Sequence, residues 1–114
     1  MPKTLSIKEN RLFRAAYARG RSAARKTMAV YVLKDRCKTV NRLGITVSVK
    51  LGGAVQRNRI RRRLKETYRL CETRLSGGHD IVIVGRHAAL TAPFETLQAD
   101  FASIARELRL EEQA

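Results

Sequence analysis

Acidic residues are scarce in this 114-residue sequence, which has ten Asp and Glu against 24 Lys and Arg. The formal net charge is therefore +14, and the isoelectric point is about 11.1. A surplus of positive charge on this scale attracts polyanions, either nucleic acid or an anionic membrane. The shortage of carboxylates thus restricts both the partners and the chemistry of the chain.

The few carboxylates are also dispersed. Those in the body of the chain lie singly on different segments: Glu9, Asp35, Glu66, Glu72 and Asp80. A nuclease that works alone needs clustered carboxylates for metal ions, or a paired His general acid and base. His79 and His87 have no acidic or nucleophilic partner within sequence reach. We therefore expect no catalytic residue and no metal ligand here, and a protein-only endonuclease is disfavoured.

Cysteine is rare and long apolar runs are missing. Cys37 and Cys71 have neither Cys-x-x-Cys spacing nor a nearby His pair, which argues against a zinc site or a structural disulfide. We expect both to be reduced, with Cys71 in the core. No apolar run approaches the ~20 residues that span a bilayer, and the first residues do not resemble a signal peptide. A cytoplasmic location is therefore expected.

Positive charge is concentrated in the first two thirds of the chain. Residues 1–75 contain 21 basic and four acidic residues, whereas residues 76–114 contain three basic and six acidic ones. The length suits one domain with a modest core, and no internal repeat is visible. The sequence therefore predicts a single binding domain, 1–114, whose partner surface lies in its first two thirds.

Hydrophobic periodicity predicts six elements. A helix is expected over 7–19, opened by a Ser6-x-x-Glu9 capping box, and a last helix is expected to open at 91–93 and to continue through Leu108. Between them we expect strands at 27–33 and 43–50, a helix at 55–75 and a strand at 81–84. The polar connection 34–42 would let the first two strands pair antiparallel.

This order, α-β-β-α-β-α, has room for one more short strand between Val40 and Lys50. It predicts an α+β fold, specifically a two-layer α-β sandwich with an exposed or half-exposed sheet face.

The segment 57–65 holds six of the 24 basic residues and keeps a helical apolar rhythm. At about 100° per residue, one narrow arc of the helix is apolar and suited to packing: Ile60, Leu64, Tyr68, Cys71 and Leu75. Basic side chains lie on both flanks of that arc: Arg57, Arg61, Lys65 and Arg69 on one, Arg59 and Arg63 on the other. The excess of Arg over Lys and the preceding Gly52-Gly53 turn favour a phosphate-bearing partner over a merely solvated helix face.

Three aromatic residues can converge where the first helix meets the sheet. Phe13 and Tyr17 are four residues apart, and Tyr31 lies on the first predicted strand. A hydrophobic core contact is one interpretation of this spacing. If the flank carrying Arg57 and Arg61 borders the same sheet, the aromatics and cations instead form a groove for unstacked bases and their phosphates. Single-stranded RNA or DNA is then the predicted ligand.

The segment 43–50, followed by Gly52-Gly53-Ala54-Val55 and by Arg57-Asn58-Arg59-Ile60-Arg61-Arg62, resembles the signature of the bacterial ribonuclease P protein subunit. The resemblance extends in element order over nearly the whole chain. It departs from the family pattern at Val49, where a second Lys is common, at Gly53, where Asn is frequent, and at Arg63, which replaces a commonly apolar residue.

The resemblance implies a left-handed β-α-β crossover, against the right-handed norm. It implies the small partner, in a 1:1 complex, of a catalytic RNA that removes the 5′ leader of precursor tRNA. The chemistry, and the Mg²⁺ that supports it, would belong mainly to the RNA. The partners implied are ribonuclease P RNA and precursor tRNA, with no membrane and no DNA.

Site residues follow from the same resemblance. Contacts with the RNA subunit are implied for Arg57, Asn58, Arg59, Arg61, Arg62, Arg63, Lys65 and Arg69, of which Arg59, Arg62 and Arg63 would face outward. Contacts with the precursor leader are implied for Phe13, Tyr17, Tyr31, Ser48, Lys50, Arg57, Arg61 and Lys65.

Composition alone also allows a ribosomal or RNA-chaperone-like binding protein without an enzyme partner. A DNA-binding helix-turn-helix is disfavoured, because a strand and not a helix precedes the Arg-rich helix.

Overall fold

The computed structural model describes residues 4–34 and 39–110, which form one mixed sheet and three α-helices. The strands are β1 (Leu5–Ser6), β2 (Arg21–Ala24), β3 (Met28–Lys34), β4 (Arg42–Thr46) and β5 (His79–Gly85). The helices are α1 (Asn10–Arg19), α2 (Ala54–Cys71) and α3 (Phe94–Glu107). Short 3₁₀ turns occur at η1 (Val49–Leu51), η2 (Glu72–Arg74) and η3 (His87–Leu90).

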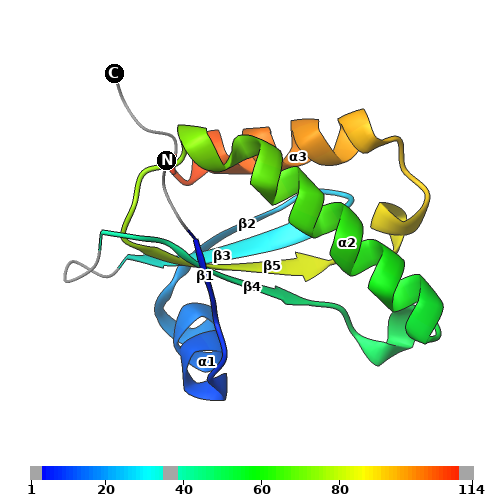
Figure 1. Cartoon of the computed structure of the whole chain (residues 1–114), viewed down its shortest axis with the longest axis horizontal. Coiled ribbons are helices and arrows are strands. Elements are labelled where there is room, and N and C mark those ends of the chain that lie inside the picture. Colours follow the sequence, from blue (N-terminus) through cyan, green and yellow to red (C-terminus); the bar gives the residue numbers. More distant parts are fainter. Residues whose placement is uncertain (1–3, 35–38, 111–114) are drawn as a thin grey trace.

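The strand order across the sheet is β1-β4-β5-β3-β2 (Figure 1). The expected pairing of 27–33 with 43–50 is wrong, because β5 lies between β3 and β4. Ile83 of β5 pairs with Val30 of β3 on one side and with Ile45 of β4 on the other. β5 occupies the centre because it is almost wholly apolar and buried, whereas an outer strand must tolerate water. β4 and β5 are parallel and are joined through α2, and the handedness of that crossover stays a prediction.

Helices α2 and α3 cover one face of the sheet, and α1 covers part of the other (Figure 1). The main core lies under α2 and α3 and includes Met28, Val30, Ile81, Ile83, Ile60, Leu64, Tyr68, Leu97 and Phe101. A second, small cluster of Ile7, Ala16 and Val82 lies under α1. The α+β class is confirmed, and the α1 side of the sheet is the half-exposed face.

Several boundaries differ from the sequence prediction. Ser6 belongs to β1, so the predicted capping box is wrong and α1 begins at Asn10, preceded by Glu9. β4 ends at Thr46 instead of residue 50, because the chain turns into η1, where the Ser48 hydroxyl accepts a hydrogen bond from the Lys50 backbone N–H. The additional strands are β1 and β2, and between Val40 and Lys50 the only strand is β4.

Cys71 is half-buried and packs against the main core, while Cys37 lies outside the described residues. In residues 4–34 and 39–110, no helix combines the length and the apolar character that crossing a membrane requires.

Candidate nucleic-acid interface

The Arg-rich helix α2 is fixed by its apolar stripe. Ile60 and Leu64 are fully buried, and Tyr68 packs edge-on against Phe101 of α3 with ring centroids 6.0 Å apart. The Tyr68 hydroxyl also shares a hydrogen bond with Thr4 at 2.8 Å, and burial raises the pKa of this phenol. The predicted core arc is therefore confirmed for these residues, and the basic side chains of α2 lie on either side of it.

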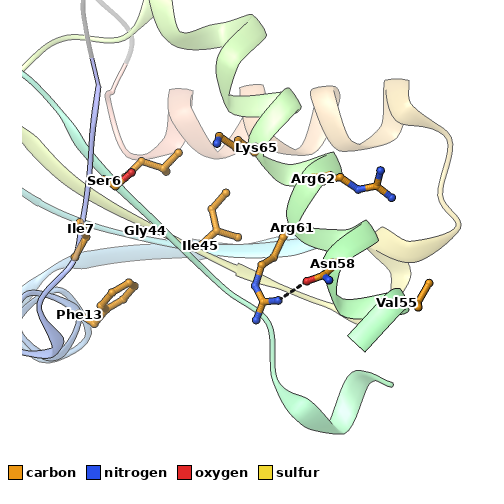
Figure 2. Close-up of a pocket in the computed structure, with 11 residues that line it drawn as sticks. Ser6, Ile7, Phe13, Gly44, Ile45, Val55, Asn58, Arg61, Arg62 and Lys65 are labelled. Atoms are coloured by element: carbon orange, nitrogen blue, oxygen red, sulfur yellow. Dashed lines mark hydrogen bonds between the residues drawn. The ribbon is translucent and has the colours of Figure 1, made fainter. Parts of the chain in front are cut away.

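One flank of α2 borders a groove of ≈ 760 Å³ that runs along the outer edge of β4 (Figure 2). It is lined by Ser6, Ile7, Phe13, Leu43, Gly44, Ile45, Val55, Asn58, Arg61, Arg62 and Lys65. The side at the sheet edge is mostly apolar, and the side formed by α2 is cationic. A groove with these two walls can hold an unstacked base against the apolar wall and its phosphate against the other.

Phe13 reaches the groove because Gly44 leaves room for its ring. A Cβ atom placed on Gly44 would stand 2.5 Å from Cε1 of Phe13, closer than any side chain could tolerate. Three of the predicted leader residues thus line the same groove, Phe13 from α1 and Arg61 and Lys65 from α2.

Tyr17 and Tyr31 form an edge-to-face pair next to Phe13, with ring centroids 4.9 Å apart. The Tyr17 hydroxyl shares a long hydrogen bond of 3.4 Å with Thr46 of β4, and its side chain is 42% exposed. Both Tyr31 and Phe13 pack against the small cluster under α1. The three aromatics thus converge as predicted, with Phe13 in the groove and the tyrosine pair on the half-exposed sheet face beside it.

The cations of this flank differ in their partners. Arg61 donates to Asn58 Oδ1 at 3.0 Å and points toward β4, whereas Arg62 is directed away from it (Figure 2). Within residues 4–34 and 39–110, no hydrogen bond or ion pair engages the side chains of Arg62 and Lys65. Arg69 is different, because its guanidinium pairs with Glu66 at 2.5 Å. This pair lowers the pKa of Glu66 and raises that of Arg69.

Arg57, Ser48 and Lys50 lie near the start of α2 and do not line the groove. Arg57 donates from Nε to the Gly52 carbonyl at 3.2 Å and so closes the turn before the helix. Gly52 has φ of 134°, a conformation that residues with a side chain rarely adopt. Ser48 and Lys50 are exposed on the turn that follows β4.

Arg63 does not face outward as expected. Its guanidinium donates to the carbonyls of Ala89 at 2.7 Å and Leu90 at 3.1 Å, and also to that of Ala92. Arg59 donates from Nε to the same Leu90 carbonyl at 3.3 Å. Because a guanidinium carries several N–H donors in a rigid fork, Arg63 can gather three carbonyls and anchor the η3 segment to α2.

Among the described residues, no group of three His, Cys, Asp or Glu side chains lies where it could hold a metal ion. His79 is buried, and its backbone N–H donates to Asn41 Oδ1 at 2.9 Å. Burial lowers the pKa of its ring, and the positive charges of Lys34 and Arg21 lower it further. His87 is exposed on η3. The two histidines therefore lie in different environments and do not form an acid–base pair.

The sequence did not predict several residues that line the groove. They lie in or just after β1, in β4 and at the start of α2: Ser6, Ile7, Leu43, Gly44, Ile45 and Val55. The predicted pairing of 27–33 with 43–50 was wrong and left the outer edge of β4 unassigned. Gly44 within a strand was the available signal, because an interior glycine often marks a close approach by another group.

Two comparisons of sequence identify relatives. The family model described as Ribonuclease P matches residues 1–109. The chain is 43% identical over 98 residues to the ribonuclease P protein component of Symbiobacterium thermophilum, covering 86% of this chain and 85% of that protein. It is 34% identical over 110 residues to that of Alkaliphilus metalliredigens, covering 96% and 98%.

Solved structures agree. The fold matches the RNase P protein of Staphylococcus aureus with a TM-score of 0.84 at 29% identity, covering 96% of this chain and all (100%) of that one. It matches the RNase P protein of Thermotoga maritima with a TM-score of 0.77 at 26% identity, covering 94% and 98%.

Proposed function

The chain belongs to the ribonuclease P protein family, and from that membership we propose that it binds both the catalytic RNA and the single-stranded 5′ leader of precursor tRNA. As a ribonuclease P protein component it is a subunit of a tRNA-processing ribonuclease, with ribonuclease P RNA and precursor tRNA as partners. We further propose 1:1 assembly with the RNA and a cytoplasmic location.

The groove beside β4 is the observation that supports leader binding. Phe13 supplies an aromatic surface in it, while Arg61 and Lys65 supply positive charge on the opposite wall. Stacking of a base on an aromatic ring contributes about 1–3 kcal/mol and requires no particular sequence. A leader bound there favours precursor over product, because the product has lost the leader.

The tyrosine pair and the turn residues extend this proposed path. Tyr17 and Tyr31 lie beside Phe13, so a second base can stack on the exposed Tyr17 ring. Ser48, Lys50 and Arg57 lie near the start of α2 and would contact leader phosphates farther along.

The RNA subunit would bind the outward side of α2. Arg62 supports this best, since its guanidinium points away from the groove floor and has no partner within residues 4–34 and 39–110. Asn58 and Arg59 lie on the same exposed part of the helix. Contacts of this kind neutralise phosphates and release counterions, which makes assembly weaken steeply with salt.

Hydrolysis itself is proposed to occur on the RNA. The dispersed carboxylates of the described residues do not fit a metal site in this chain. Mg²⁺ bound by the RNA would supply the activated nucleophile, while the groove side chains Phe13, Arg61 and Lys65 hold the leader in place.

The test is cleavage of a 5′-extended precursor tRNA by the host's ribonuclease P RNA at low Mg²⁺, with and without this protein. Marked stimulation, with no cleavage by the protein alone, is expected. Tight RNA binding without stimulation would contradict the proposal and favour a ribosomal or chaperone-like role.

A further inference from the structure

Strand β2 forms the edge of the sheet opposite to β4 and the groove, since the strand order is β1-β4-β5-β3-β2 (Figure 1). It pairs antiparallel with β3 on one side, where Ala23 lies opposite Val30. Helix α3 packs on one face of β2, and Ala23 is buried there in the main core. Within the described part of the chain, no strand covers the outer edge of β2.

The peptide groups of Ser22 and Ala24 face outward from this edge. The Arg25 N–H donates to the Met28 carbonyl at 2.8 Å, so Arg25 bonds toward β3. Along an antiparallel strand, the hydrogen-bonding groups of successive residues point alternately to the two sides, so Ser22 and Ala24 point away from β3. The Ala24 carbonyl accepts a hydrogen bond from the Arg25 guanidinium at 2.8 Å. Among the described residues, nothing bonds to the other open groups, which are the Ser22 N–H, the Ser22 carbonyl and the Ala24 N–H.

Three cations border this edge. The side chains of Arg19, Arg21 and Lys26 are exposed, and no hydrogen bond or ion pair with another described residue engages them. Arg25 is different, because its guanidinium pairs with Glu107 at 2.8 Å. Charged side chains on an edge strand oppose pairing with a strand of like charge, whereas opposite charges across a strand pair stabilise it. The edge of β2 is therefore suited to an acidic strand.

A second copy of this chain fits the edge poorly. Two β2 strands that pair antiparallel through both open residues place Ser22 of one copy opposite Ala24 of the other. This register sets Arg21 opposite Arg25, and like charges directly opposite each other destabilise a strand pair. RNA also fits less well, because phosphates accept hydrogen bonds, whereas the Ser22 carbonyl needs a donor. An extended peptide supplies a donor and an acceptor together.

We propose that the outer edge of β2 is a docking site for an extended acidic peptide segment of another protein, which adds a strand to the sheet. Backbone hydrogen bonds to Ser22 and Ala24 give the affinity, and carboxylates beside Arg21 and Lys26 give the preference for acidic sequences. Strands β5 and β3 separate this edge from β4, so the peptide does not compete with a leader in the groove. The inference goes beyond the proposed function and does not depend on it.

The experiment uses a fluorescent peptide of about eight residues in which glutamate and valine alternate. Two control peptides carry backbone N-methyl groups on every glutamate or on every valine. Both keep the charge, and one of them blocks the pairing side, whichever register forms. Binding to the full-length protein is followed by fluorescence anisotropy.

The protein variants separate the backbone from the charge. Ser22→Pro removes the outward N–H without breaking the β2–β3 ladder, and Ser22→Ala is the matched control that keeps it. Arg21→Gln removes one of the bordering charges.

With wild-type protein and with Ser22→Ala, we expect one methylated peptide to bind about tenfold more weakly than the unmodified one. Ser22→Pro should weaken binding of the unmodified peptide about fivefold. Arg21→Gln should weaken it about threefold, with a smaller effect at high salt. Should Ser22→Pro fail to fold, the comparison of the three peptides on wild-type protein decides by itself.

Equal affinity of wild-type protein for all three peptides would overturn the inference, because the binding would then be charge attraction alone. Dimers of the protein that Ser22→Pro dissociates would overturn it in favour of a second copy at this edge. Weaker binding of single-stranded RNA by Ser22→Pro than by Ser22→Ala would overturn it in favour of RNA. None of these results bears on the leader site, which lies at the opposite edge of the sheet.

Discussion

The ring of Phe13 lies over the backbone of Gly44, so close that a Cβ atom on this glycine would stand 2.5 Å from ring carbon Cε1. The contact joins α1 to β4 and turns an aromatic side chain into the groove. Any side chain at residue 44 must displace that ring or move the strand. The pair therefore links the packing of the small cluster under α1 to the shape of the proposed leader site.

Gly44→Ala is expected to lower the free energy of unfolding by about 1–3 kcal/mol, because the added methyl group overpacks this contact. It should also weaken precursor binding, since the ring is displaced. Urea denaturation and precursor affinity measure the two effects. In the double variant Gly44→Ala/Phe13→Leu the smaller side chain should recover part of the stability. If the two substitutions destabilise additively, the contact with Phe13 is not the reason why a side chain at residue 44 destabilises the fold.

Tyr17→Ala should reduce precursor affinity by about 1–3 kcal/mol while leaving assembly with the RNA subunit unchanged. Tyr17 is 42% exposed and its ring lies edge-on against Tyr31, so the loss of packing is small compared with that of a buried aromatic. Binding is measured with precursor and mature tRNA in parallel. Tyr17→Phe is the control, because it keeps the ring and removes only the long bond to Thr46. If Tyr17→Ala unfolds the protein, Tyr17 is a core residue.

Arg63→Ala is expected to destabilise the fold by about 2 kcal/mol, because the carbonyls of Ala89, Leu90 and Ala92 lose their shared donor. The salt dependence of RNA-subunit binding should stay unchanged, since these donors face the η3 segment. Thermal unfolding and the slope of binding affinity against salt separate the two properties.

Arg62→Ala is the matched control for Arg63→Ala. The neighbouring guanidinium is exposed, so its removal should change stability by less than about 0.5 kcal/mol. It should reduce the salt slope by about one unit, as expected for one lost phosphate contact. The reverse result, with Arg63→Ala changing the slope and Arg62→Ala changing the stability, would refute these assignments.

His79 should make stability depend on pH below neutrality. Its pKa is lowered in the folded state by burial, so the unfolded chain takes up a proton first as the pH falls. Neutral His79 makes its full contribution to the free energy of unfolding above the unfolded-state pKa of about 6.5. That contribution is lost as the pH falls from this value to the lower pKa of the folded state. The slope contributed is at most about 1.4 kcal/mol per pH unit. Urea denaturation from pH 8 to pH 5 should show a shallower decline for His79→Gln, and identical declines would contradict the burial argument.

Local patterns were sufficient to predict the elements that carry the site. The apolar stripe of α2 is a property of its own sequence, so Ile60, Leu64 and Tyr68 could be placed on the core from spacing alone. The convergence of Phe13 with Tyr31 was likewise predictable, because each lies on a strongly patterned element.

What sequence could not supply were the long-range relationships. The insertion of β5 between β3 and β4 depends on residues some forty positions downstream of β4, and β1 is too short to leave a periodic signal. Arg63 lies at the flank angle of a solvent-facing residue, yet three carbonyls from the η3 segment converge on it.

The central claim is that the groove between α2 and the edge of β4 holds the leader, and the affinities of the reconstituted particle for precursor and mature tRNA test it most directly. We expect wild-type protein to favour the precursor, and Phe13→Ala to abolish most of that preference without affecting the affinity for mature tRNA. Equal affinities with wild-type protein, or an unchanged preference with a folded Phe13→Ala variant, would contradict the account.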